Sequence, residues 1–572
     1  MASLTKKIIR GHAYYYAREC GWVNGKPRIV RTIYLGKVED ILAAVSNSRQ
    51  PAPVRRVTLA DFGAVAAVWG IAESIKLTEI IDRHILKREQ GLSVGQYLTL
   101  AAVNRAACPA SKRRLGAWHK KTILRRLCPA QKEQLTSQRF WDHMSYVGED
   151  QIRAIEQDIC RAVVDTYHID LRCLAYDATN FFTFISSRTP GELAERGHNK
   201  NGRDDLRQVC LALLVSTDSH IPLFHETYAG NVHDSVEFGN VLKQLTDRYT
   251  DFAKECSDIT LVFDKGNNSE DNIEVLDETP YGFIGSLVPT YHADLLAIER
   301  EHFRPFIGER LQSVSAYRTT KKVFGADRTV LVTFNENLYT EQLTTLMEQI
   351  NKRKLELYSI QRRLQRWERG EIKAGKPPTF NGTQKQVDKL LSARHMKEVF
   401  AVTLQSAVKS KLPRLTFRVN SEGIERLCRT LFGKTLIFTD RHEWSDEDIV
   451  SGYRGQYKIE HAFRTMKDPY FVSWNPMFHW TDQKIRVHAF YCVLGLLLTS
   501  LLQRILQQAK MDISIHEAMQ QLSEIRETLI IHGRGVKHPL TTTVLTDMDE
   551  SQREMFDILQ LKRYLPPNIT AP

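Results

Sequence analysis

The feature that most constrains the fold is a change of apolar pattern at residue 171. From there the apolar residues occur in short runs, at 171–177, 208–216, 221–230, 259–264 and 281–288, with a helical segment beginning near Asp234. Short apolar runs bounded by turn residues favour buried strands, and strands that alternate with helices favour an α/β core. The sequence therefore predicts the order strand, strand, strand, helix, strand, helix, strand.

Two of these runs end in an aspartate. Asp177 ends LRCLAYD and Asp264 ends ITLVFD. Two converging carboxylates repel each other unless a cation or hydrogen bonds compensate, and Mg²⁺ takes carboxylate oxygens while leaving positions for phosphate and water. A shared metal site is one interpretation. An ordinary strand-end or turn role is the other, and it is the more usual one for any single aspartate.

A third acidic residue lies on a predicted helix in SDEDIVSGYRGQYKIEHAFRTMK. Ser445 has the features of an N-cap, so the helix is expected to begin near residue 446. Seven residues on a straight helix turn through almost two full revolutions, which places Tyr453, Glu460 and Lys467 on one face. The alternative is a solvent-exposed helix in which Glu460 pairs with Arg464 one turn later.

Together these residues resemble the catalytic triad of DDE transposases of bacterial insertion sequences, which have an RNase H-like fold. The resemblance is to the subgroup whose last catalytic helix carries tyrosine, arginine, glutamate and lysine at fixed spacing and follows a large insertion. Tyr453, Glu460 and Lys467 fall on that pattern, but Gln456 stands at the arginine position. Further blocks resemble the subgroup, namely RGHNKNGRDDLRQ (196–208), GNVHD (230–234), FGKTLIFTD (432–440), HAFRTMK (461–467) and IRVHAF (485–490).

The resemblance implies the chemistry. Asp177, Asp264 and Glu460 would hold two Mg²⁺ ions, with Mn²⁺ as a substitute, about 3.5 to 4 Å apart as in other two-metal sites. The implied activity is hydrolysis at the transposon ends followed by transfer of the 3′-hydroxyls into target DNA. The implied partners are double-stranded DNA, as terminal inverted repeats and target, and a second copy of the chain. The residues expected to contact DNA phosphates are Tyr453, Lys467, Arg464, Arg196, Lys200 and Arg203. For the loop that holds the last three, a solvated basic turn is the alternative.

Pattern and composition divide the chain into seven segments. They are a β unit (1–46), a linker (47–57), a mainly helical DNA-binding region (58–167), the first part of the core (168–288), an insertion subdomain (289–430), the second part of the core with the catalytic helix (431–505) and a C-terminal helical region (506–572). Asn24-Gly25 is a hairpin signal in the first. In the insertion, Leu343, Ile350, Leu357 and Leu364 recur every seven residues, which favours a helical hairpin or a helix lying on DNA or a second protomer.

Bulk properties agree with a DNA partner. The formal charge is +12 with a pI near 9.1, which suits a polyanionic partner, although a merely solubilising charge is the alternative. Nine cysteines without a CxxC pair favour a reducing cytosol and indicate neither a zinc site nor a disulfide framework. The longest apolar run, 489–502, is too short to span a bilayer and is expected to be a buried helix, so no membrane partner is expected.

Two other functions remain open from the sequence. One is an RNase H-like nuclease that cleaves without joining, and the other is a non-catalytic DNA-binding derivative of a transposase. All three acidic residues are present in their expected contexts, which favours a catalytic function.

Overall fold

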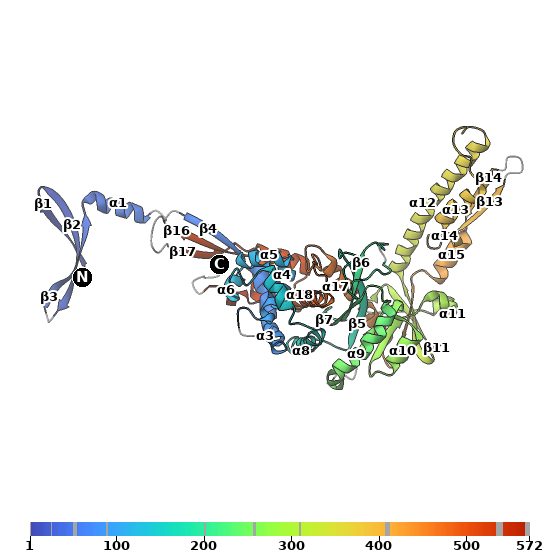
Figure 1. Ribbon diagram of the computed structural model, residues 1–572, viewed down its shortest axis with the longest axis horizontal. Coiled ribbons are helices and arrows are strands. Elements are labelled where there is room, and N and C mark those ends of the chain that lie inside the picture. Colours follow the sequence, from blue (N-terminus) through green and yellow to red (C-terminus); the bar gives the residue numbers. More distant parts are fainter. Residues whose placement is uncertain are drawn as a thin grey trace. The chain divides into compact units, whose positions relative to one another are not determined.

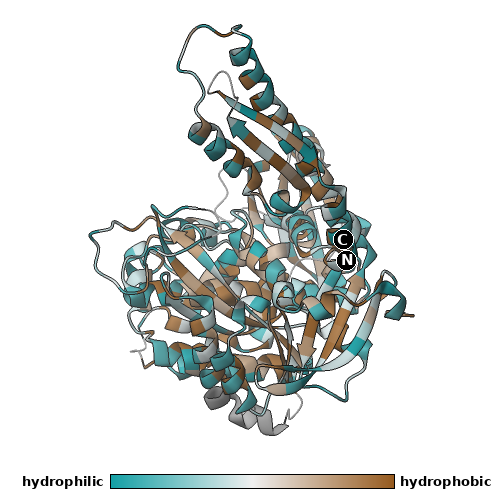
Figure 2. Ribbon diagram, turned by 90° about the vertical axis from the view of Figure 1, so that its right-hand side faces the viewer, coloured by the Kyte–Doolittle hydropathy of each residue, from teal (hydrophilic) through white to brown (hydrophobic). Residues whose placement is uncertain are grey.

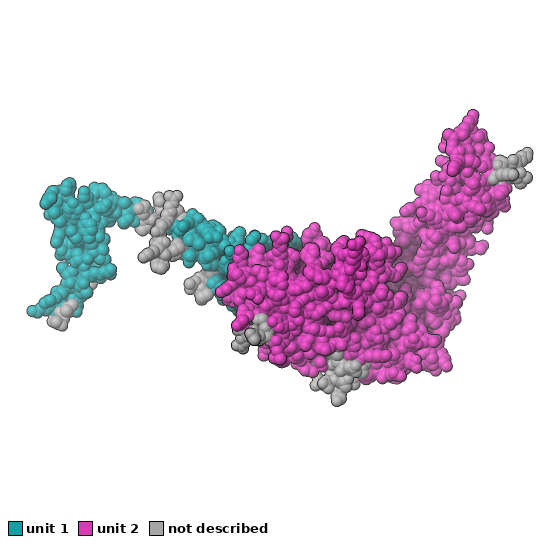
Figure 3. Space-filling view, in the orientation of Figure 1, with its two compact units in different colours: residues 1–66, 119–127, 520–572 teal, residues 67–118, 128–519 magenta. Residues whose placement is uncertain are grey.

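The computed structural model describes residues 2–23, 26–49, 54–86, 90–199, 202–255, 259–307, 311–406, 412–533 and 541–566. The Asn24-Gly25 turn, residues 50–53 of the expected linker and Lys200 lie outside these ranges. The chain forms two compact units (Figure 3). Unit 1 comprises residues 1–66, 119–127 and 520–572, and unit 2 comprises residues 67–118 and 128–519.

Unit 2 is built on a nine-stranded sheet in the order β10-β11-β12-β15-β9-β8-β5-β6-β7. The strands are β5 (Cys173–Thr183), β6 (Arg207–Ser216), β7 (Pro222–Ala229), β8 (Thr260–Val262), β9 (Gly282–Ser286), β10 (Arg304–Pro305), β11 (Val314–Val323), β12 (Ala326–Asn335) and β15 (Lys434–Thr439). β5, β6 and β7 are antiparallel neighbours, whereas β8 and β9 continue the sheet in parallel with β5. The predicted strand and helix order is therefore observed.

Helices cover both faces of this sheet, which explains why the strands are apolar on both sides. α9 (Asp234–Glu255) lies on one face, where Phe238 contacts Tyr176 of β5 at 4.8 Å between ring centroids. α16 (Asp446–Arg454) and α17 (Tyr457–Lys467) lie on the other face, against β9 and β5 respectively. α10 (Glu270–Asp277) packs beside α9. Figure 2 shows the strands mainly in hydrophobic colours and the outer helices mainly in hydrophilic ones.

The expected buried helix is α18 (Asp482–Gln508). It is long and apolar enough to pass a composition test for a membrane span, yet 94% of its most apolar window is buried inside the protein. It packs against β7 and against α4 (Val94–Ala107) of the helical region. A core helix explains its apolar character.

The region expected to be helical does contain mostly helices. They are α2 (Gly63–Ser74), α3 (Leu77–Arg83), α4, α5 (Lys112–Lys120), α6 (Leu124–Leu127), α7 (Ser137–Met144) and α8 (Glu149–Tyr167). One strand, β4 (Val54–Asp61), precedes them and overlaps the predicted linker. α8 leads directly into β5 through residues 168–172, so the helical region adjoins the sheet.

The region expected as an insertion divides into two parts. Its first strands, β10 to β12, join the large sheet, because β12 pairs with β15, which follows the insertion. Residues 336–430 form a separate layer with its own core, containing α12 (Glu336–Glu368), α13 (Phe380–Leu391), α14 (Met396–Val399), β13 (Phe400–Ser406), β14 (Pro413–Val419) and α15 (Ser421–Thr430) (Figure 1). Ile350, Leu357 and Leu364 are buried in that core, so the heptad stripe faces this subdomain.

Unit 1 contains two small sheets. β1 (Ala2–Ile9), β2 (His12–Val23) and β3 (Lys26–Gly36) form an antiparallel meander followed by α1 (Val38–Arg49). β4 pairs with β16 (Arg526–His532), which also pairs with β17 (Thr541–Leu545). The C-terminal region is therefore not purely helical. α19 (Ile515–Glu524) and α20 (Glu550–Ile558) are its helices.

Candidate active site

Asp177 lies in the middle of β5 and not at its end, which corrects the position expected from the sequence. β5 continues to Thr183 because it stays paired with β6 along its whole length, up to Thr183 opposite Arg207. The parallel pairing with β8, by contrast, stops at Ala175 opposite Val262. Asp177 therefore follows the point at which the neighbouring strand ends.

The strand register places Asp264 beside Asp177. Each aspartate comes two residues after the last parallel pair, Ala175 and Val262. A two-residue step returns a side chain to the same face of a sheet, so both carboxylates continue the same row of the two strands. Asp264 immediately precedes a short 3₁₀ turn, η1 (Lys265–Asn267), and both aspartates are half-buried. The sheet thus brings together two carboxylates that are 87 positions apart in the chain.

Ser286 and Tyr453 support Asp264. The Ser286 hydroxyl, at the end of β9, donates a hydrogen bond to Asp264 Oδ1 at 3.2 Å, and the side chains of Ser286 and Tyr453 are also hydrogen-bonded. Burial raises the pKa of Tyr453 to about 12, and the negative charges of Asp264 and Glu460 raise it as well. The phenol is therefore neutral at physiological pH and available as a donor.

The predicted catalytic helix is broken into two helices, so the expectation of one straight helix was wrong. Ser445 is the N-cap of α16, as expected, since its side chain accepts from the Asp448 N–H at 3.1 Å. α16 ends at Arg454, and α17 begins at Tyr457 after a tight turn. Gly455 occupies the break, where a Cβ atom would lie 2.7 Å from Cβ of Thr217. The close approach of the loop after β6 explains why glycine stands there.

Despite the break, the three motif residues all belong to the helical layer on the carboxylate face. Lys467, at the end of α17, donates to Thr179 Oγ1 at 2.5 Å and lies 5.5 Å from the centre of the Phe181 ring. Thr179 and Phe181 follow Asp177 at steps of two on β5 and share its face. Glu460 lies about two turns earlier on α17 and is exposed, as is Arg464.

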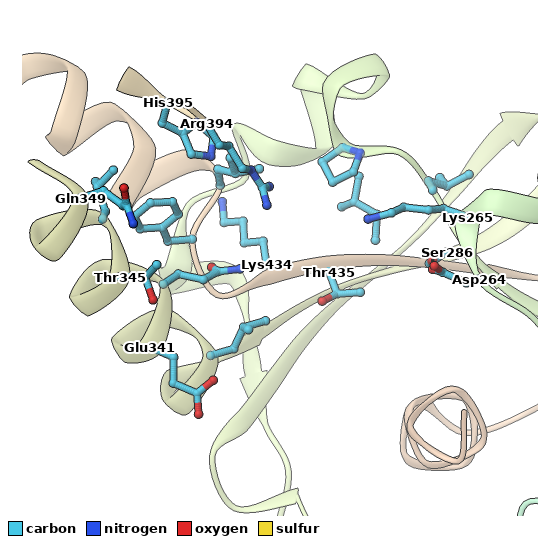
Figure 4. Close-up of a pocket in the computed structure, with 18 of the residues that line it drawn as sticks. Asp264, Lys265, Ser286, Glu341, Thr345, Gln349, Arg394, His395, Lys434 and Thr435 are labelled. Carbon is cyan, nitrogen blue, oxygen red and sulfur yellow. The ribbon is translucent and has the colours of Figure 1, made fainter. Parts of the chain in front are cut away.

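A pocket of about 700 Å³ opens beside Asp264 (Figure 4). Asp264 and Ser286 lie at one end, and Tyr453 is also part of the lining. At the other end lie residues of α12 and of the segment before α14, among them Gln349, Arg394 and His395. The cationic side chains in its lining are Lys265, Arg394 and Lys434. The separately packed subdomain therefore borders the pocket that opens at Asp264.

Burial affects one of these cations directly. Lys434 donates to the carbonyl oxygens of Leu296 and Ile298 at 2.7 and 2.8 Å. Burial, and then the positive charges of Arg300 and Arg429, lower the pKa of Lys434 to about 8. An anion in the pocket would favour its charged form.

The basic loop at 196–205 lies at the far end of β5, and two glycines bring it there. A Cβ on Gly197 would lie 1.9 Å from the Gly230 carbonyl oxygen, so the two segments touch through their backbones. Gln208 fixes the arrangement, because its amide donates to the carbonyl oxygens of Gly230 at 2.8 Å and His198 at 3.1 Å. Asn180 of β5 in turn donates to Gln208 at 2.7 Å.

Within this loop Arg196 and Arg203 are exposed, and Lys200 lies outside the described residues. Arg203 forms a bidentate ion pair with Asp205 at 2.8 and 2.9 Å, so Asp205 is occupied by a cation of its own loop. Asp234 is the first residue of α9 and accepts a hydrogen bond from Tyr228 at 2.7 Å.

Sequence reasoning missed Ser286, Asn180 and Gln208 as supporting residues. Ser286 lies in the apolar run 281–288, and a hydroxyl at the end of a buried strand next to an Asp-ending strand was the available signal. Asn180 lies in DATNFF, beyond the predicted end of the strand, so its neighbours could not be assigned without the β5–β6 register.

The donor set suits a hard divalent cation. In the described ranges, no group of three or more His, Cys, Asp or Glu side chains lies close enough to hold a metal ion. The site as folded offers Asp177 and Asp264 in adjacent positions, with Ser286 oriented toward Asp264. Mg²⁺ in phosphoryl-transfer sites is commonly held by one or two carboxylates together with water and substrate phosphates, so this pair fits the ion.

Comparison with known proteins gives the family. The model of the transposase DDE domain matches residues 170–494, which is more than half of the chain and includes Asp177, Asp264 and Glu460. The chain belongs to this transposase family. No curated protein matches it. The cryo-EM structure of the piggyBac transposase synaptic complex with hairpin DNA is similar with 8% identity and a TM-score of 0.35, covering 90% of this chain and 85% of that one.

Proposed function

We propose that the protein is a bacterial insertion-sequence transposase that cleaves its element's ends and joins their 3′-hydroxyls to target DNA. The observation that carries the proposal is the register of β5 and β8, which aligns Asp177 with Asp264 inside the region matched by the DDE transposase family. The order β7-β6-β5-β8-β9 supports an RNase H-like core, because an antiparallel trio is extended by parallel strands on one side.

Asp177, Asp264 and Glu460 would hold two Mg²⁺ ions, which would supply the charge that activates the nucleophile and stabilises the leaving oxygen. Asp177 and Asp264 provide the fixed pair. Glu460, exposed on α17, completes the site when DNA brings a phosphate against that helix. Ser286 and Tyr453 hold the Asp264 carboxylate in orientation through their hydrogen bonds. Such positioning matters because small misplacements of reacting groups reduce rates steeply.

The surrounding cations would bind the DNA backbone. Lys467 is held by Thr179 on the carboxylate face, so its ammonium group is in place to contact a phosphate near Asp177. Other cations would bind phosphates further along the DNA, namely Arg464, Arg196, Lys200 and Arg203. Arg203 would release its ion pair with Asp205 and bind a DNA phosphate instead. These contacts position DNA and do not read its sequence. A homodimer in the cytosol, with one protomer at each element end, completes the proposal.

The test compares the wild-type chain with Asp177→Asn, Asp264→Asn and Glu460→Gln. The substrate is a labelled duplex carrying the element's own end, incubated with target DNA and Mg²⁺. We expect each variant to lose cleavage and joining by several powers of ten while still binding DNA. Asp204→Asn, which changes an exposed aspartate of the basic loop, is the matched control and should retain activity.

Other results would select another function. Cleavage by the wild type without joining would indicate a nuclease. Binding without cleavage would indicate a non-catalytic derivative. Full activity in Glu460→Gln would mean that a different acidic residue completes the site.

A further inference from the structure

Residues 473–481, the second part of the segment that joins α17 to α18, expose two large aromatic side chains. Phe478 is 71% and Trp480 54% exposed, whereas Met477 and His479 are buried. This alternation is that of an extended backbone, in which every second side chain points to the same side. Phe478 and Trp480 therefore project together from one edge of the loop, which we call the aromatic loop.

Two buried side chains fix the aromatic loop from beneath. Arg105 of α4 is only 2% exposed and donates to the carbonyl oxygens of Ser473 and Asn475 at 2.9 and 2.8 Å. His488 of α18 hydrogen-bonds the Trp474 carbonyl oxygen at 2.7 Å. The backbone that carries Phe478 and Trp480 is thus held by the core, so the exposed rings are presented with little entropy left to lose on binding.

The exposed Trp480 is also supported by stacking. Its ring lies 4.8 Å from that of Trp141 at an interplanar angle of 30°, and Trp141 in turn stacks on His479 at 5.2 Å and 23°. Lys484 Nζ lies 5.0 Å from the centre of the Trp141 ring and attracts its electron-rich face. Trp480 thus rests on a fixed partner and leaves an indole surface free to stack on a nucleobase.

The aromatic loop lies on the carboxylate face of the sheet. Trp474 stacks on Phe181 of β5 at 4.3 Å and 13°. Phe181 shares a strand face with Asp177 and Thr179, and Lys467 contacts both Thr179 and Phe181. DNA that reaches Asp177 along this face therefore passes toward the aromatic loop.

The charge around the aromatic loop favours nucleic acid over a protein partner. Lys112 of α5 hydrogen-bonds His479, and the next residues of that helix, Arg113 and Arg114, are exposed. Lys484 is buried and Lys112 half-buried, and burial lowers their pKa values to about 8 and about 7, so the two exposed arginines carry the positive charge beside the loop. Exposed aromatic rings beside two exposed arginines match bases and phosphates in the same ligand.

We propose that Phe478 and Trp480 form a stacking platform for unpaired nucleobases of the DNA strand held at the carboxylates. The inference rests on the proposed function, because it takes the DNA at the site as given. It adds that this DNA is unpaired next to the cleavage position and that the loop captures the bases so released. A platform of this kind accepts any base, since every base has an aromatic face.

The test measures binding by the full chain without Mg²⁺, so that it does not depend on cleavage. The probes are a fluorescently labelled blunt duplex and the same duplex with a short single-stranded 3′ extension carrying 2-aminopurine. We expect the wild type to prefer the extended duplex and to quench 2-aminopurine fluorescence. Phe478→Ala with Trp480→Ala should weaken binding of the extended duplex roughly 10- to 100-fold and abolish quenching, with blunt-duplex binding unchanged.

Two further variants separate stacking from structure. Trp480→Phe keeps a flat ring and should retain most of the preference. Tyr470→Ala removes an aromatic side chain that is 83% exposed but lies outside the aromatic loop, and it should behave as the wild type. Equal melting temperatures exclude a folding defect as the cause.

The outcomes distinguish this inference from the proposed function. An extension preference and quenching that survive in the double alanine variant would overturn the platform alone. A wild type that shows the preference but never cleaves with Mg²⁺ would overturn the proposed function alone. A wild type with no preference for the extended duplex would overturn the platform, and a partner protein would then be the better occupant.

Discussion

At the scale of single residues, the site depends on groups whose ionisation is set by their surroundings. Tyr453 interacts with both Asp264 and Glu460, and burial together with these charges raises its pKa to about 12. It therefore stays protonated at neutral pH, so it can donate a hydrogen bond and is not placed to accept a proton.

We expect Tyr453→Phe to slow DNA cleavage by roughly tenfold, because one hydrogen bond in the support of a charged carboxylate is removed. The plot of cleavage rate against pH should keep its shape below pH ~10, because the removed phenol does not titrate in that range. Single-turnover cleavage rates at several pH values measure both. Tyr457→Phe, at an exposed tyrosine of α17, is the control and should change neither.

Glu237 gives a second prediction, for stability. Burial, and then repulsion by Glu226, raises the pKa of Glu237 from 4.5 to about 7. The folded protein holds this proton up to about pH 7, while the unfolded chain releases it near 4.5. Its stabilising contribution is therefore complete below pH 4.5 and falls away as the pH rises through 7.

Glu237→Gln mimics the protonated form, so the variant should be more stable than the wild type at pH ~8, by about 1 to 3 kcal/mol, and equally stable near pH ~4.5. Melting temperatures across this range provide the measurement. Glu270→Gln changes an exposed glutamate in the first turn of α10 and serves as the control. A wild type that is the more stable of the two at the higher pH would contradict the assignment.

At the scale of elements, the break between α16 and α17 decides where the motif residues point. α16 packs against β9 and carries Tyr453 to Ser286, while α17 packs against β5 and carries Lys467 to Thr179. A single straight helix would fix one axis for both contacts. The turn at Gly455 lets each helix follow its own strand.

Gly455→Ala should destabilise unit 2 by roughly 1 to 3 kcal/mol, because the new methyl group would lie 2.7 Å from Cβ of Thr217 and force the turn or the strand to move. Chemical denaturation measures the change in unfolding free energy. Gly266→Ala is the matched change at a glycine with no atom within 4 Å of the added carbon, and its unfolding free energy should differ little from that of the wild type. Equal unfolding free energies of the two variants would mean that the turn at Gly455 can shift to accommodate the added methyl group at little cost.

At the scale of the whole molecule, charge is distributed unevenly. The small sheet β1–β3 and the residue after it carry eight lysines and arginines, Lys6, Lys7, Arg10, Arg18, Lys26, Arg28, Arg31 and Lys37, against one acidic residue, Glu19. Most of its described side chains are exposed on both faces, including Trp22 and Tyr34. A three-stranded sheet with so little core is expected to be completed by a ligand, and its charge favours DNA.

We therefore expect a variant with four basic residues of this sheet replaced by Gln to bind a blunt duplex more weakly than the wild type. The replaced residues are Lys6, Lys7, Arg28 and Arg31. The slope of log affinity against log salt should fall by about 0.9 for each phosphate that the variant no longer neutralises. Titrations at several salt concentrations give both values. Replacing Lys352, Arg362, Arg366 and Lys385 of the insertion subdomain by Gln removes the same charge elsewhere. An equal effect of the two sets would attribute binding to net charge and not to this sheet.

The helices and strands whose formation depends on residues close together in the chain could be predicted from the amino-acid sequence. The apolar runs from 171 to 288 became β5 to β9, Ser445 capped α16 as its spacing predicted, and the heptad residues Ile350, Leu357 and Leu364 were buried along α12. Each follows from interactions between residues close in sequence, namely periodic burial, capping and turn formation. Local context alone favoured an ordinary role for each of the three acidic residues. They were selected through the resemblance to the DDE motif, and their catalytic role stays a prediction.

How these parts meet depends on the tertiary structure. Asp177 was expected at a strand end because nothing local reveals that β6 keeps pairing as far as Arg207 while β8 stops at Val262. β10 to β12 joined the large sheet because β15, far along the chain, provided the partner strand. The break at Gly455 and the clamp of Arg105 on the aromatic loop likewise require a neighbour distant in sequence. Strand register and close packing are properties of pairs of segments, so no single segment specifies them.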